Sequence, residues 1–130
     1  MGKVFHDYSV MSTETNLHIA IANYIKLQYP SVIFTSESSG IRLSIGQATQ
    51  IKKMRSSAGL PDLWLLEPRK GYHACLLELK REGTDIYKKN GDLRKNKHLS
   101  EQEEILHRLQ EKGFFAKFDD AKAVVDFYLG

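Results

Sequence analysis

The sequence predicts an α/β fold, because helical and strand-like segments alternate along the whole chain. Two observations support this class. Apolar residues recur at helical spacing in three places, and short apolar runs bounded by turn residues lie between them. The predicted order is helix, strand, a segment of uncertain structure, strand, strand, helix, strand, helix. The 130 residues predict a single domain, residues 1–130, with enough apolar content for a core.

The first predicted helix follows an irregular arm at residues 1–11. Ser12 or Thr13 is expected to cap it, with Glu14 in the first turn, where a negative charge suits the positive helix end. Its predicted buried stripe consists of Leu17, Ala20, Ile21, Tyr24 and Ile25. Glu14 continues this stripe, and two interpretations follow. It either stabilises the helix dipole or is an acid at the edge of a functional site.

Pro30 is expected to end this helix, and Val32–Phe34 is the first predicted strand. The polar stretch at residues 36–57 has no acid after Glu37, and a short helix is predicted around residues 47–54. The cations of this stretch are Arg42, Lys52, Lys53 and Arg55. They are well placed to hold phosphates, and the alternative is a solvated loop with ordinary surface charge.

Two apolar strands are predicted at residues 62–66 and 73–80, joined by a turn at residues 67–71. The second is apolar on both faces, which indicates a central strand. Successive strand side chains point to opposite faces, so Glu78 and Lys80 share one face. Asp62 stands at the start of the first strand. The alternative is an ordinary strand pair with solvated charges.

Two carboxylates and an ammonium at the end of a central strand pair are costly as structure alone. A hard divalent cation between Asp62 and Glu78 would offset their repulsion. Mg²⁺ suits such a site, because it takes one or two carboxylates together with water and phosphate. Lys80 beside that ion is then able to orient or deprotonate a water, or to stabilise charge on a phosphate.

The link at residues 81–99 is unusually long and polar, which indicates a functional or flexible segment. Its cations are Lys88, Lys89, Arg94, Lys95 and Lys97. We expect a basic flexible arm that binds nucleic-acid backbone, with Tyr87 placed to stack on a base. The alternative is a solvated tether without a role.

The second long helix is predicted to begin at the capping box Ser100–Glu103. Its predicted inner face consists of Ile105, Leu106 and Leu109, and Gln102 lies on that face at the end nearest Lys80. Gly113 ends the helix. A fourth strand at residues 114–118 and a last helix capped by Asp119 or Asp120 follow. The buried stripe of that helix is Ala121, Val124, Val125 and Tyr128.

Composition narrows the class of protein. The net charge of +3 and the pI near 8.9 permit nucleic-acid binding without requiring it. The single cysteine, Cys75, excludes an internal disulfide and a cysteine-based zinc site, and it is expected to be buried. No Gly-rich phosphate loop, membrane span or signal peptide is visible, so an intracellular, cytoplasmic protein without a nucleotide cofactor is expected. The histidines His18, His73 and His107 show no ligand spacing and are assigned no chemistry.

The chain resembles the PD-(D/E)xK nuclease superfamily. More closely it resembles the VRR-NUC (virus-type replication-repair nuclease) family, in its small stand-alone phage form. That pattern is an acid on the first helix, Gly-x-Pro-Asp, Glu-x-Lys and a Gln on the following helix. This chain supplies Glu14, Gly59-Leu60-Pro61-Asp62, Glu78-Leu79-Lys80 and Gln102. The resemblance runs from about Thr13 to the end, and the long link departs from the shorter family pattern.

The resemblance implies an αβββαβ core with a mixed sheet flanked by helices, and a Mg²⁺-dependent DNA endonuclease in which Mn²⁺ substitutes. Asp62, Glu78 and the Leu79 carbonyl are then metal ligands, with Glu14 acting directly or through water. Lys80 activates the attacking water, and Gln102 bonds Lys80 or the metal's water. Branched DNA such as a Holliday junction and a homodimer are further implications. The rival hypotheses are a non-catalytic nucleic-acid-binding module on the same fold and a nuclease acting on RNA.

Overall fold

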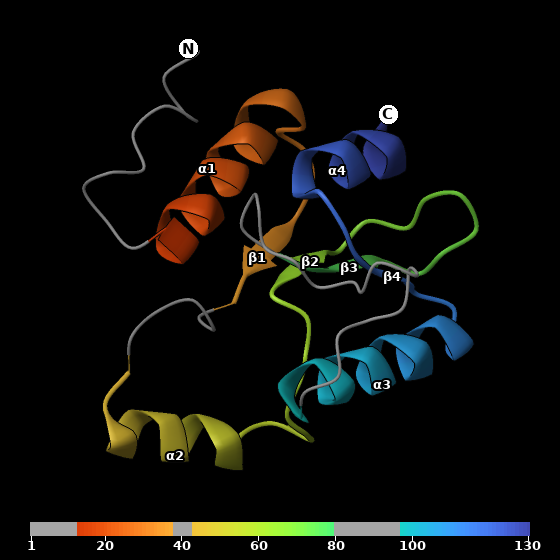
Figure 1. Ribbon diagram of the computed structural model, residues 1–130. Helices are drawn as coiled ribbons and strands as arrows, with labels where there is room; N and C mark the ends of the chain where they lie inside the picture. The colour runs from red at the N-terminus through yellow and green to blue at the C-terminus, as the bar shows by residue number, and fades with distance from the viewer. Residues whose placement is uncertain (1–12, 38–42, 80–96) are drawn as a thin grey trace, which may run out of the picture.

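The computed structural model describes residues 13–37, 43–79 and 97–130. Its centre is a four-stranded sheet with the strand order β1-β2-β3-β4 (Figure 1). The strands are β1 Phe34–Ser36, β2 Leu63–Leu65, β3 Cys75–Glu78 and β4 Phe115–Phe118. β1, β2 and β3 pair antiparallel, whereas β3 and β4 pair parallel. The fold is therefore α/β with a mixed sheet, which confirms the predicted class.

Helices lie on both faces of this sheet (Figure 1). The helices in the described ranges are α1 Thr13–Gln28, α2 Ile45–Lys53, α3 Lys97–Glu111 and α4 Ala121–Leu129. α1 and α4 cover one face and α3 covers the other, while α2 stands to one side (Figure 1). α2 is the short helix predicted in the basic stretch, and Ser44 caps it in a capping box with Gln47. None of its side chains is buried.

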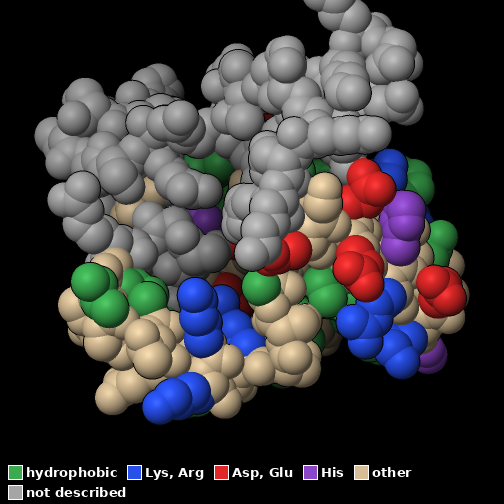
Figure 2. Space-filling model, turned by 60° about the horizontal axis from the view of Figure 1, so that its bottom comes forward, with side chains coloured by type: hydrophobic (Ala, Val, Ile, Leu, Met, Phe, Trp, Pro, Cys, Tyr) green, Lys and Arg blue, Asp and Glu red, His purple; other side chains and the backbone are tan. Residues whose placement is uncertain are grey.

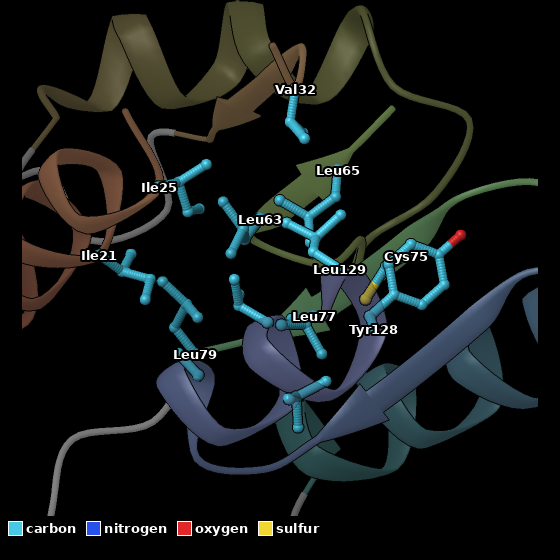
Figure 3. Packing of buried hydrophobic residues seen from close by; sticks show 13 residues of the cluster. Ile21, Ile25, Val32, Leu63, Leu65, Cys75, Leu77, Leu79, Tyr128 and Leu129 are labelled. Atoms are coloured by element: carbon cyan, nitrogen blue, oxygen red, sulfur yellow. The ribbon is translucent and has the colours of Figure 1, made fainter. Parts of the chain in front are cut away.

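The larger core lies between the sheet and the helix pair α1 and α4 (Figure 3). The stripes predicted for these helices do point inward, with Leu17 and Tyr24 half-buried at the border and the other members buried. From the sheet, Leu63, Leu65, Cys75 and Leu77 meet them, and each is completely buried. Burying one such leucine stabilises the fold by about 1.5–3 kcal/mol. Burial also raises the pKa of the Cys75 thiol to about 12, as expected for a small buried apolar residue.

A smaller core lies on the opposite face of the sheet, under α3. It consists of Leu76, Leu99, Leu106, Ala116 and Phe118. Leu77 packs in the large core and Leu76 in the small one, so β3 is buried on both faces. The prediction of a central strand is confirmed. Glu78, two residues after Leu76 on the same face, therefore points toward α3.

Tyr24 and Tyr29 join α1 to α4 through one carboxylate on α4. Their hydroxyls donate to Asp126 Oδ1 at 2.6 and 2.7 Å, and Lys122 Nζ donates to Oδ2 at 3.1 Å. Burial alone would raise the pKa of Asp126, but these three hydrogen bonds outweigh it and lower the pKa. The same carboxylate raises the pKa of Tyr29 to about 12. Two tyrosines and an acid thus fasten the helix pair that covers the large core.

Several predicted boundaries are wrong. The strands predicted at residues 62–66, 73–80 and 114–118 are shorter, because the ladder pairing covers only Leu63–Leu65, Cys75–Glu78 and Phe115–Phe118. The first strand covers Phe34–Ser36 and not Val32–Phe34, because Val32 turns into the large core and Ile33 is 69% exposed before pairing with β2 begins. The second long helix begins at Lys97, so Ser100 lies inside it and is not its N-cap. The additional turn buries Leu99 in the small core, which outweighs the local capping signal. Residues 97–99, predicted as link, are helical.

The predicted arm at residues 1–11 and the link up to residue 96 lie outside the described residues. Within the described part of the chain, no helix is long and apolar enough to span a membrane.

Candidate active site

Pro61 fixes the conformation of the turn that leads into β2. This residue is completely buried, and its carbonyl accepts a hydrogen bond from the Trp64 indole nitrogen at 2.7 Å. Gly59, two residues earlier, has a φ of +81°. A Cβ at Gly59 would lie 2.9 Å from the Glu101 carbonyl carbon and oxygen and 3.1 Å from the Gln102 amide. The turn therefore presses directly on the backbone of α3, and only glycine fits there.

Asp62 follows this turn and is 2% exposed. Its amide donates to the Leu77 carbonyl at 3.0 Å, and its Oδ2 accepts from the Leu79 amide at 3.3 Å. The backbone and the side chain of Asp62 thus reach Leu77 and Leu79, the residues on either side of Glu78. This geometry places Asp62 beside the end of the neighbouring strand.

Glu78 is the last residue of β3 and is also 2% exposed. Its Oε1 accepts a hydrogen bond from Gln102 Nε2 at 2.5 Å, and Gln102 is itself buried on α3. The turn at Gly59 touches the backbone of the same α3 residue. Asp62, Glu78 and Gln102 therefore meet at one end of the sheet from three elements that are distant in sequence.

Two buried carboxylates at one end of a sheet are costly without compensating partners. The hydrogen bonds from Leu79 and Gln102 offset part of this cost. Carboxylate oxygens are the ligands that Mg²⁺ and Mn²⁺ prefer, so these two acids fit a divalent cation. Among the described residues, no three His, Cys, Asp or Glu side chains gather closely enough to hold a metal ion. Mg²⁺ requires no such cluster, because it usually keeps several waters and takes one or two carboxylates.

His18 is a member of this site that sequence reasoning missed. It is 8% exposed on α1, its Nδ1 is hydrogen-bonded to the Ser36 hydroxyl at the end of β1, and its Nε2 lies 3.9 Å from Asp62 Oδ2. The only signal in the sequence is its position four residues after Glu14, one helical turn along α1. The contacts to Ser36 and Asp62 join three separate segments, and no local pattern predicts them.

Several predicted site residues fall outside the described part of the chain. Glu14 belongs to the first turn of α1 and Lys97 to the first turn of α3, but their side chains are not described. The other predicted residues beyond the described ranges are Arg42, Lys80, Lys88, Lys89, Arg94 and Lys95. Their predicted roles stay predictions. The carbonyl of Leu79 belongs to a completely buried residue that directly follows Glu78.

Of the basic residues predicted to bind nucleic acid, those whose side chains are described lie on and after α2. Lys52 and Lys53 occupy its last turn, both are exposed, and Arg55 lies 3.9 Å from the Glu37 carboxylate. Figure 2 shows Lys and Arg side chains without acidic neighbours at the lower left, on the side of α2, whereas at the right, toward α3, acidic and basic side chains are mixed. The chain from Leu43 to Pro61 contains no acid. The surface of α2 is therefore locally positive.

The close contact between Gly59 and α3 yields a stability prediction. Gly59→Ala should lower the free energy of unfolding by about 2–5 kcal/mol, because a strained positive φ and a clash with immobile backbone add. Gly71→Ala is the matched control, since Gly71 has a φ of +85° and nothing within 4 Å of the added Cβ. It should cost only about 1–2 kcal/mol. Thermal denaturation compares the two variants, and equal losses would show that the turn does not press on α3.

Comparison with known proteins supports the fold. No protein-family model matches this chain, and neither does any curated protein sequence. A solved structure described as a VRR_NUC domain protein superposes with a TM-score of 0.62 over 92% of this chain and 89% of that one, at 22% sequence identity. This chain therefore has the fold of a VRR_NUC domain protein.

Proposed function

We propose that this protein is a nuclease that uses a divalent cation to hydrolyse phosphodiester bonds in DNA. The observation that carries the proposal is the burial of two carboxylates, Asp62 and Glu78, side by side at one end of neighbouring antiparallel strands. Hydrogen bonds from Leu79 and Gln102 offset part of the cost of burying this pair, and a bound cation would offset more of it. The shared fold with a VRR_NUC domain protein supports a nuclease over other phosphate-binding classes.

Asp62 and Glu78 would hold the cation, with the Leu79 carbonyl as a backbone ligand and Glu14 acting directly or through water. A bound Mg²⁺ or Mn²⁺ would polarise the scissile phosphate and lower the pKa of a water. Gln102 keeps the Glu78 carboxylate oriented through its 2.5 Å hydrogen bond. Lys80, two residues after Glu78, would orient the attacking water or stabilise the charge that develops on the phosphate.

DNA would lie along the positive surface of α2, where Lys52 and Lys53 extend into solvent. Phosphate contacts of this kind position a nucleic acid without reading its sequence. Arg42, Lys97 and the cations of the link, Lys88, Lys89, Arg94 and Lys95, would extend the same contact. A homodimer acting on a symmetric four-way junction is part of this proposal.

The test uses purified protein with labelled duplex, flap and four-way-junction DNA, each in Mg²⁺, in Mn²⁺ and in EDTA. Cleavage in either metal and none in EDTA is the expected result. A non-catalytic binding module on the same fold is the second candidate, because the basic surface would bind DNA whether or not the protein cleaves it. DNA that is bound but stays intact in every metal would favour that candidate, and cleavage of RNA alone would make the substrate RNA.

The positive surface of α2 gives a binding prediction. Lys52→Gln/Lys53→Gln should weaken DNA binding and reduce the slope of log K against log[salt] by up to about 1.8, because two phosphate contacts disappear. The matched control is Lys26→Gln/Lys112→Gln, which removes the same charge from exposed positions on α1 and after α3. Fluorescence anisotropy over a range of salt measures both. If the two double variants lost the same DNA affinity, the effect would come from net charge and not from a contact at α2.

A further inference from the structure

A buried imidazole nitrogen points at the carboxylate on which the proposed metal site depends. His18 is 8% exposed, and its Nε2 is completely enclosed without a hydrogen-bond partner among the described residues. Burying an unsatisfied polar nitrogen lowers the stability of the fold, so a partner for this atom is expected. Asp62 Oδ2 lies 3.9 Å away, too far for a direct hydrogen bond and close enough for both atoms to contact one intervening atom.

The opposite nitrogen fixes the orientation of the ring. Nδ1 forms a hydrogen bond with the Ser36 hydroxyl, which holds the imidazole between α1 and β1. With the proton on Nδ1 donated to Ser36, Nε2 carries a lone pair directed toward Asp62. Histidines that bind metals are oriented in the same manner, by a hydrogen bond from the second ring nitrogen.

We propose that His18 Nε2 is a ligand of the divalent cation held at Asp62, and that this nitrogen makes the site prefer Mn²⁺, Co²⁺ or Ni²⁺ over Mg²⁺. The inference rests on the proposed function for the existence of the metal. Two ligand atoms about 2.1 Å from one cation lie at most about 4.2 Å apart, so one cation is able to reach both Nε2 and Oδ2 across 3.9 Å. The described His, Asp and Glu side chains do not gather as a group of three, so Glu78 would reach this cation through a water. Imidazole suits later transition metals, whereas Mg²⁺ prefers oxygen and water.

The test is a set of thermal-shift titrations with Mg²⁺, Mn²⁺ and Ni²⁺ at pH 8, on the full chain. His18→Ala should bind Mn²⁺ and Ni²⁺ at least about tenfold more weakly. Removing only a residue that orients a metal ligand already lowers affinity by about that factor. Its Mg²⁺ response should change far less, so the Ni²⁺-to-Mg²⁺ preference should fall. His107→Ala is the matched control, because His107 is an exposed histidine on α3 and should leave all three responses unchanged.

An unchanged Ni²⁺-to-Mg²⁺ preference in His18→Ala, with an Mg²⁺ response that still needs Asp62, would overturn this inference and leave the nuclease proposal standing. A stronger response to every cation would also overturn it, since it would show that His18 pairs with Asp62 as a cation. A wild type that no cation stabilises would overturn both proposals.

A second measurement needs no variant and so does not depend on whether His18→Ala folds. In the NMR spectrum of the wild type, substoichiometric Mn²⁺ should broaden the ring protons of His18 before those of His73 and His107. Broadening of the two exposed histidines first would place the cation elsewhere and overturn the inference.

Discussion

Asp62→Asn should abolish DNA cleavage and the stabilisation of the protein by divalent cations together. The substitution keeps an oxygen that accepts the Leu79 amide, so the fold should persist while the charge that attracts the cation disappears. Metal catalysis supplies several kcal/mol of transition-state stabilisation, so the rate should fall by a factor on the order of 10³ or more. Single-turnover cleavage and thermal scans with and without Mn²⁺ measure the two effects.

The control for this substitution is Asp119→Asn, an exposed acid after β4 whose carboxylate lies 4.0 Å from Lys117. It should keep both cleavage and the metal response. At a Mn²⁺ concentration a hundred times the dissociation constant, binding adds about 2.7 kcal/mol to the stability of wild type. If Asp62→Asn showed the same melting-temperature rise as the control, Asp62 would not be a ligand.

Lys80→Ala should separate chemistry from metal binding. A protonated ammonium offers no lone pair to a cation, so its removal should leave the affinity for metal intact. Turnover should fall on the order of a hundredfold or more, if the ammonium acts on the attacking water or on the charge of the phosphate. Single-turnover rates beside a metal titration distinguish this result from that of Asp62→Asn, which should lose both.

Lys117→Ala provides a matched control, since Lys117 is an exposed lysine on β4. It should cleave like wild type. Near-normal cleavage by Lys80→Ala would mean that the spacing Glu78-Leu79-Lys80 is accidental, and most of the case for a nuclease would go with it.

The sequence predicted those parts of the fold that depend on periodicity. Ile21 and Ile25 on α1 and the stripe on α4 lie in the large core, because an amphipathic helix buries its apolar face. β3 is apolar on both faces, and this pattern indicated that it is a central strand of the sheet. These patterns lie within a single element. They show that one face of a helix, or both faces of a strand, will be buried, whichever elements pack against them.

Boundaries and contacts between distant segments could not be predicted in this way. The run Val32–Phe34 is equally apolar throughout, and only pairing with β2 decides that the strand begins at Phe34. The start of α3 depends on the small core that buries Leu99. His18 belongs to the site because it contacts Ser36 and Asp62, which are distant from it in the sequence. The resemblance suggested Gln102, but its hydrogen bond to Glu78 is known only from the packing of α3 on the sheet.

The central claim is that Glu78 and Asp62 hold a divalent cation, and direct counting of bound Mn²⁺ tests it best. Free Mn²⁺ gives an electron paramagnetic resonance signal that weakens when the ion binds, so a titration measures binding without any substrate. Wild type should bind Mn²⁺ in competition with Mg²⁺, whereas Glu78→Gln, which keeps the shape of the side chain beside Gln102, should leave the ion free. Equal binding by the two proteins would contradict the claim.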